Sequence, residues 1–171
     1  IVGQCACMLL AMAWTTNWLR SELADLVRNR ALAEGRALAL DLAARAERLD
    51  PTAFEPRSEA WDELRTLCGQ TKTPDAGRAI ILRLGDGALL CSSGVGARPE
   101  LLETHPGKAL LESPTDAGPL HTALERTSER SSRTVAGRIV FEGALWTVSA
   151  TRIPHSDAAA AILQDEQQID Q

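Results

Sequence analysis

The first nineteen residues, Ile1 to Leu19, carry no charged side chain, and they run without a proline into a charged segment, residues 20–50. An α-helix rises about 1.5 Å per residue, so about 20 residues cross the ~30 Å hydrocarbon core of a bilayer. Trp14 and Trp18, followed by Arg20, fit an aromatic belt at a membrane interface with a charged flank. We therefore expect residues 1–19 to form a transmembrane segment that contacts membrane lipid.

Other interpretations of this segment stay open. Gln4, Thr15, Thr16 and Asn17 are polar, which also suits a buried core helix. A secretory signal is disfavoured because no basic flank precedes the apolar residues. The chain opens with Ile1 and stops in the polar run 164–171, so we expect both ends to be cuts within a longer polypeptide, with a truncated span and the start of an exit linker.

Residues 20–50 carry leucine at helical spacing. Offsets of three, four and seven residues separate Leu19, Leu23 and Leu26, and then Leu38, Leu42 and Leu49. Charged residues occupy the positions between, which predicts one long amphipathic helix, with Gly35 as the place for a bend. The leucines are expected either to join two copies in a homodimer and transmit a signal or to pack on the following domain; spacing alone does not separate these alternatives.

Pro51 and Pro56 end this helix, and a compact domain is expected over residues 51–163. Its predicted elements are a helix at 58–67, a hairpin at 79–84 and 88–92, a helix at 120–126 within an irregular crossover, and a hairpin at 134–141 and 144–153. The first hairpin turns at Gly85-Asp86-Gly87. Residues 158–163 are alanine-rich and are expected to form either a fifth strand or an exit helix. The fold class is therefore α+β, with a membrane-spanning helix that continues into a long amphipathic helix and an antiparallel sheet with a helical crossover.

This order of elements resembles the extracytoplasmic PAS-like sensor domains known as Cache domains. The resemblance covers about residues 20–163 and is carried mainly by segments 80–92 and 138–153. It implies a periplasmic ligand-sensing domain in the bacterial inner membrane. Such a domain serves a signal-transduction protein, such as a two-component histidine kinase, a cyclase or a chemoreceptor. It also implies a small-molecule pocket walled by the second hairpin, and an output domain elsewhere in the full-length protein.

Arginine and tryptophan supply the candidate ligand contacts. The planar guanidinium donates two parallel hydrogen bonds to a carboxylate or phosphate. Arg83, Arg138 and Arg152 lie on predicted strands, Arg133 lies just before one, and Trp146 lies on the apolar face of the last strand. We expect these residues to include the ligand contacts, although each also suits an ordinary place on a sheet.

Several kinds of chemistry lack a signature in the sequence. There is no Gly-x-Ser-x-Gly motif and no zinc-ligand spacing, so we expect neither an enzyme nor a cofactor or metal in this segment. The net charge of −5, without a basic block, makes nucleic acid an unexpected partner. Cys68 and Cys91 could pair in an oxidising compartment or remain two buried thiols.

A structural subunit is the alternative interpretation. Pilins and secretion pseudopilins also join an apolar N-terminal helix to an antiparallel sheet. This chain departs from their pattern because Cys5, and not an acidic residue, stands at the fifth position.

Overall fold

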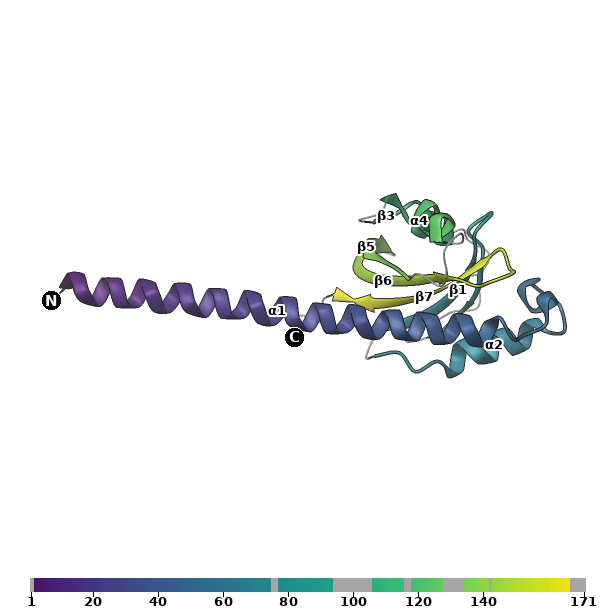
Figure 1. The fold of residues 1–171 in the computed structure, drawn as a ribbon, viewed down its shortest axis with the longest axis horizontal. Helices are drawn as coiled ribbons and strands as arrows, with labels where there is room; N and C mark the ends of the chain where they lie inside the picture. The colour runs from purple at the N-terminus through teal and green to yellow at the C-terminus, as the bar shows by residue number, and fades with distance from the viewer. Residues whose placement is uncertain are drawn as a thin grey trace.

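The computed structural model describes residues 2–74, 77–93, 106–115, 118–127, 134–141 and 143–166. A long helix, α1 (Val2–Ala46), runs along one face of an antiparallel sheet, and its N-terminal half projects away from the domain (Figure 1). The predicted α+β class, with a long N-terminal helix and an antiparallel sheet, is confirmed.

The elements after α1 follow in this order: η1 (Pro51–Phe54), α2 (Trp61–Gln70), β1 (Arg78–Arg83), β2 (Leu89–Ser92), α3 (Pro106–Glu112), β3 (Pro114–Thr115), β4 (Gly118–Pro119), α4 (Leu120–Thr127), β5 (Val135–Phe141), β6 (Ala144–Arg152) and β7 (Ala158–Asp165). Five strands form one antiparallel sheet in the order β2-β1-β7-β6-β5, and β3 pairs with β4 separately. Helices α1 and α2 lie on one face of the large sheet, and α3 and α4 lie on the other (Figure 1).

Both predicted hairpins are present. Strands β1 and β2 pair across the Asp-Gly turn, with Ile81 opposite Cys91 and an irregularity after Ile81. Strands β5 and β6 pair with Ile139 opposite Trp146. The predicted helix at 120–126 corresponds to α4, whereas the helix expected at 58–67 begins later, at Trp61. Ser58 does not cap it, because its hydroxyl donates to the backbone carbonyl of Thr52 at 2.6 Å.

The alanine-rich segment that the sequence left undecided is a strand. It forms β7, which pairs with β1 on one side and β6 on the other and so lies in the middle of the sheet. The side chains of Ala158 to Leu163 are almost fully buried, with alternate residues in the two cores on the two faces. Helix propensity is outweighed here by two sets of inter-strand hydrogen bonds and burial on both faces.

The leucines of α1 do not share one face. Leu42 is fully buried, and Leu38 and Leu49 pack against the same core beneath α1. Leu19, Leu23 and Leu26 are 54%, 55% and 65% exposed. Successive helical residues turn by about 100°, so the 19 positions from Leu19 to Leu38 leave the two sets roughly 100° apart. The expectation of one continuous stripe was wrong: the second set of leucines packs on the following domain, and the first set is exposed.

The expected membrane span over residues 1–19 is not supported. In the part of the chain that the structure describes, no helix has a stretch both long and apolar enough to cross a bilayer. Gln4 and Asn17 interrupt the apolar run, and the hydroxyls of Thr15 and Thr16 donate to the backbone carbonyl of Met12 at 3.0 and 2.7 Å.

Gly35 allows α1 to lie close to the sheet. A Cβ atom at this position would lie 3.0 Å from Ser149 Oγ on β6 and 3.1 Å from Gln164 Oε1 on β7. Ser149 Oγ is buried and has no hydrogen-bond partner among the described residues, so its burial carries a desolvation cost at this point of the interface. The helix continues through Gly35 without the expected bend.

Replacing Gly35 by leucine should therefore force α1 away from β6 and β7. We expect a loss of about 1–3 kcal/mol in the free energy of unfolding, the usual cost of overpacking a tight interface. Urea denaturation measures it. Gly69→Leu in α2 is the matched control, because a Cβ there meets nothing within 4 Å and leucine favours helix. Equal free energies for the two variants would contradict the close approach at Gly35.

Candidate functional site

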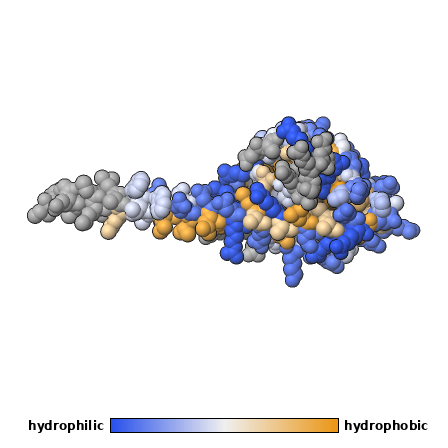
Figure 2. Space-filling view, in the orientation of Figure 1, coloured by the Kyte–Doolittle hydropathy of each residue, from blue (hydrophilic) through white to orange (hydrophobic). Residues whose placement is uncertain are grey.

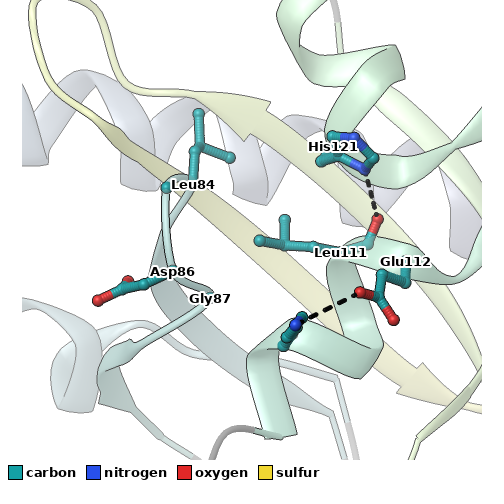
Figure 3. A pocket seen from close by; sticks show the side chains of 8 residues that line it. Leu84, Asp86, Gly87, Leu111, Glu112 and His121 are labelled. Carbon is teal, nitrogen blue, oxygen red and sulfur yellow. Dashed lines mark hydrogen bonds and ion pairs between the residues drawn. The ribbon is translucent and has the colours of Figure 1, made fainter.

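A cavity of about 430 Å³ lies where the helical crossover meets the turn between β1 and β2. Its walls come from the turn, from α3 and from α4 (Figure 3). The lining residues are Leu84, Gly85, Asp86 and Gly87 of the turn, Lys108, Leu111 and Glu112 of α3, and His121 of α4. We call this space the crossover cavity.

The turn that forms one wall is held by local hydrogen bonds. Asp86 accepts from the backbone amide of Ala88 at 3.0 Å and from Arg83 Nη1 at 3.1 Å. The backbone amide of Gly85 donates to Asp157 Oδ2 at 3.2 Å, which ties the turn to the connection between β6 and β7. Asp86 is thus held by its own hairpin, and this wall has a fixed shape.

The turn also packs on α3 by direct backbone contact. A Cβ on Gly107 would lie only 2.0 Å from the carbonyl oxygen of Gly87, and Gly87 itself has a positive φ of 72°. No other residue fits at Gly107 without separating the turn from α3. This contact places Lys108 at the cavity wall, opposite the Asp-Gly turn.

His121 links α4 to α3 at the other wall. Its Nδ1 lies 3.3 Å from the carbonyl oxygen of Leu111, and its Nε2 lies 3.2 Å from Thr122 Oγ1 (Figure 3). A carbonyl can only accept, so Nδ1 carries a proton and donates to Leu111. Lys108 and Glu112 are 4.0 Å apart and about two-thirds exposed, so their side chains remain free to turn toward a ligand.

The crossover cavity thus combines an apolar floor with both signs of charge. Leu84 and Leu111 supply the floor, and an ammonium group and two carboxylates stand at its edge. Such a space suits a small molecule that has an apolar part and a few polar groups. In the described residues no group of three or more histidine, cysteine or acidic side chains could hold a metal ion.

The predicted ligand residues do not gather around this cavity. Arg83 pairs with Asp86 and lines a different cavity, of about 420 Å³, between η1 and the turn before β7. Trp146 is 6% exposed and belongs to the core, with the guanidinium of Arg78 5.3 Å from its ring centroid. Arg152 is half-buried at the end of β6. Arg133 lies outside the described residues.

The residues that do line the crossover cavity were missed. Lys108 and His121 fall in the segment whose prolines and glycines predicted only an irregular crossover. The Pro106-Gly107 pair was a usable signal, because proline is favoured in the first turn of a helix. It marks the start of α3, directly before Lys108.

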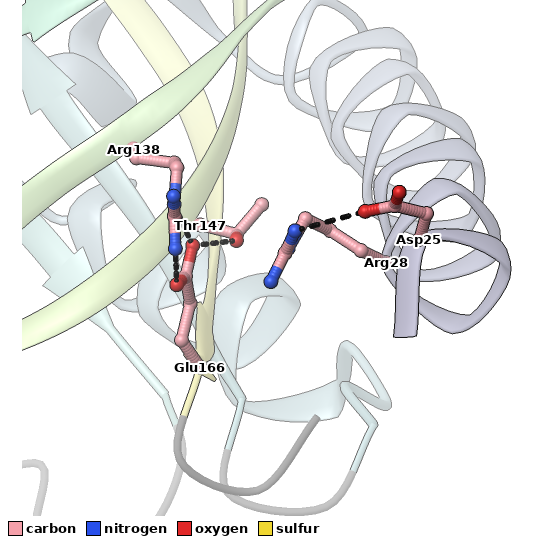
Figure 4. Close-up of polar contacts among 5 residues, drawn as sticks. All are labelled: Asp25, Arg28, Arg138, Thr147 and Glu166. Atoms are coloured by element: carbon pink, nitrogen blue, oxygen red, sulfur yellow. Dashed lines mark hydrogen bonds and ion pairs between the residues drawn. The ribbon is translucent and has the colours of Figure 1, made fainter. Parts of the chain in front are cut away.

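Arg138 holds the end of β7. Its Nε and Nη2 donate to the two carboxylate oxygens of Glu166, and Thr147 Oγ1 donates to the same carboxylate at 3.1 Å (Figure 4). The side chain of Glu166 is only 7% exposed. The hydrogen bonds from Arg138, and then that from Thr147, outweigh burial and lower the pKa of Glu166.

Cys68 and Cys91 are buried free thiols in this structure. Cys68 Sγ donates to the carbonyl oxygen of Ala79 at 3.2 Å. Burial, together with the neighbouring Cys68 thiol, raises the pKa of Cys91. The sulfur of Cys91 is therefore protonated at neutral pH and poorly reactive in the folded protein.

The comparisons with known proteins concern the fold. No family model and no curated protein matches the chain. Among solved structures it is similar to a methyl-accepting chemotaxis protein from Vibrio parahaemolyticus RIMD 2210633. The TM-score is 0.51 at 14% sequence identity, over 88% of this chain and 95% of that chain. The two chains share a fold. At this identity the likeness speaks for the arrangement of the elements and not for the residues of a site.

The Arg138–Glu166 pair predicts a pH dependence of stability. Because the folded-state pKa is lowered, the stabilisation is present above the ordinary value of 4.5 and is lost as the pH falls through the lower folded value. Glu166→Gln should cost about 1–2 kcal/mol at pH 7, a figure reduced for the exposure of Arg138, and the gap to the original chain should close at acidic pH. Urea unfolding across pH measures both.

The control is Asp41→Asn, which removes an exposed pair with Arg45 on α1. It should cost only about 0.5 kcal/mol. A Glu166→Gln gap that stays constant from neutral to acidic pH would show that the carboxylate charge does not stabilise this corner.

Proposed function

We propose that this chain is a sensory input module of a signal-transduction protein, which binds a small molecule in the crossover cavity and transmits its presence through α1. The fold shared with a chemotaxis protein supports the class of role. The observation that carries the proposal is the course of α1, which crosses the sheet opposite the cavity and then extends beyond the domain (Figure 1). Binding without catalysis or a cofactor is proposed for this segment.

The contact between α1 and the sheet suits such transmission. Where α1 passes Gly35, the facing side chains are Ser149 and Gln164, both small or polar and both buried. Large apolar side chains interlock and resist sliding, and neither of these two facing side chains is one. A ligand that binds better to one arrangement of turn, α3 and sheet shifts the population toward that arrangement, and α1 moves with the strands beneath it.

A homodimer through α1 is part of the proposal. Met12, Leu19, Leu23 and Leu26 are more than half exposed and recur at helical spacing on the side opposite Arg28 and Gly35. Figure 2 shows apolar atoms gathered along one side of the projecting half of α1. An exposed apolar stripe on a long helix is typically covered by a second helix. In a parallel dimer, each residue of the stripe would face the same residue of the other copy.

Extracytoplasmic location, contact of residues 1–19 with lipid, and a kinase, cyclase or chemoreceptor output domain stay predictions. The pilin-like alternative would use the same exposed stripe for open-ended assembly. The fold shared with a chemotaxis chain over almost all of its length favours the sensor.

Charge placed in the exposed stripe should weaken self-association. The double change Leu23→Glu and Leu26→Glu puts two like charges on each copy at the proposed contact, and we expect the dimer dissociation constant to rise at least about tenfold. Sedimentation equilibrium measures it, and circular dichroism checks that the sheet persists. Ser21→Glu, on the opposite side of α1, is the control. Unchanged association in the double variant would refute the interface, and an open-ended series of larger species would favour the pilin-like alternative.

Ligand binding should stabilise the fold. In a thermal-shift screen of organic acids, amino acids, amines and purines, a compound at 100 times its Kd adds about 2.7 kcal/mol. Lys108→Ala should weaken the response to a compound that occupies the crossover cavity. Lys72→Ala, the same change at an exposed lysine outside the cavity, should leave the response intact. Equal responses in both variants would place the compound elsewhere.

A further inference from the structure

A third cavity, of about 460 Å³, lies at the edge of the sheet, between α1 and the edge strand β5. Arg28, Leu32 and Arg36 of α1 form one wall, and Arg138 of β5 and Thr147 of β6 form the other. It shares no lining residue with the crossover cavity. We call it the arginine cavity.

The charged residues that line this cavity are positive, whereas the net charge of the chain is negative. All three charged residues that line it are arginines, in a chain whose net charge is −5. The other two cavities described above each carry carboxylates, such as Asp86 and Glu112 in one and Glu47 and Glu55 in the other. Asp25 and Glu166 pair with Arg28 and Arg138, so the guanidinium of Arg36 is the charge at this hollow that no acid among the described residues offsets, and it favours an anion there.

Two of the three arginines pair with acids that are not among the lining residues. Asp25 Oδ1 accepts from Arg28 Nη1 at 3.3 Å, one turn earlier on α1. Glu166, buried and bonded to Thr147, holds the Nε edge of Arg138 (Figure 4). Arg36 has no hydrogen-bond or ion-pair partner among the described residues. The site is therefore partly preorganised, with one exposed guanidinium left to complete it.

We propose that the arginine cavity binds a small oxyanion, namely a phosphate, sulfate or carboxylate group, between α1 and β5. A guanidinium donates paired hydrogen bonds to such a group. Because Arg28 and Arg36 belong to the helix and Arg138 to the sheet, a bound anion bridges the two. It holds α1 at one position along the strands, through a site that is separate from the crossover cavity.

The test is isothermal titration calorimetry of the whole chain with inorganic phosphate, sulfate and succinate, each against sodium chloride at the same ionic strength. At least one anion should bind with measurable heat. Arg36→Gln should weaken that binding about tenfold or more, since it removes a charge-assisted contact. Arg30→Gln, the same change at an exposed arginine of α1 outside the cavity, should leave the Kd within about twofold.

Arg36 makes no contact on which the described fold depends, so its variant is expected to keep the wild-type unfolding curve, and a loss of binding then reports on the site. Absence of binding for all three anions would overturn the proposal, as would equal loss in the two variants. Vesicles with and without phosphatidic acid separate a lipid phosphate from a free one. Binding to the anionic vesicles alone would overturn the assignment to a free anion.

Discussion

The packing of α1 across β6 and β7 is the contact on which the rest of the structure depends. It rests on small side chains from both partners, with Ala39 and Ala43 on the helix and Ala158 and Ala160 on β7. Small residues bring the helix backbone near the strands, where many weak dispersion contacts add up. Leu42 on the helix and Ile162 on β7 are large side chains that are fully buried in the same cluster. The C-terminal half of α1 therefore packs closely on the sheet, and its N-terminal half projects away from it (Figure 1).

This closeness also explains the composition of the central strand. A strand covered on both faces reads as a continuous apolar run, and such runs are usually valine, isoleucine and leucine. Here four consecutive alanines begin β7. On one face they admit α1, and on the other Ala159 and Ala161 lie beneath the core covered by α3 and α4. Larger side chains on the first face would lift the helix from the sheet and remove the contact at Gly35.

Local signals in the sequence predicted the hairpins well, because an Asp-Gly turn between two apolar runs fixes both the turn and the pairing of its strands. The undecided segment at 158–163 needed information that no local pattern carries, since its strand state comes from β1 and β6, which lie far from each other in the chain. The leucine spacing failed for a different reason. Offsets within each set of three leucines were correct, but the longer interval between Leu26 and Leu38 rotates one set away from the other.

The candidate sites also combine features that local sequence predicts with features that depend on tertiary contacts. Arg138 could be predicted as an anion-binding residue from its side-chain chemistry alone. Arg28 and Arg36 line the same cavity as Arg138 only because β5 is the edge strand beside α1. The second hairpin was expected to wall the ligand pocket, with Trp146 as one of the contacts. Trp146 lies in the hydrophobic core. Burial of a strand residue on a covered face follows from topology, so residue type and alternation alone could not distinguish core from pocket.

The two proposed binding sites, in the crossover cavity and in the arginine cavity, would have a thermodynamic consequence. Both ligands would act on the same variable, the position of α1 over β6 and β7, since the arginine cavity touches the helix directly and the crossover cavity reaches it through the strands. An anion with equal affinity for two positions of α1 changes nothing, however tightly it binds. If it favours one position, it raises or lowers the affinity of the other site by a fixed factor, and by linkage the other ligand changes the affinity for the anion by the same factor. The exposed half of α1, which projects away from the domain (Figure 1), would then carry the sum of the two effects.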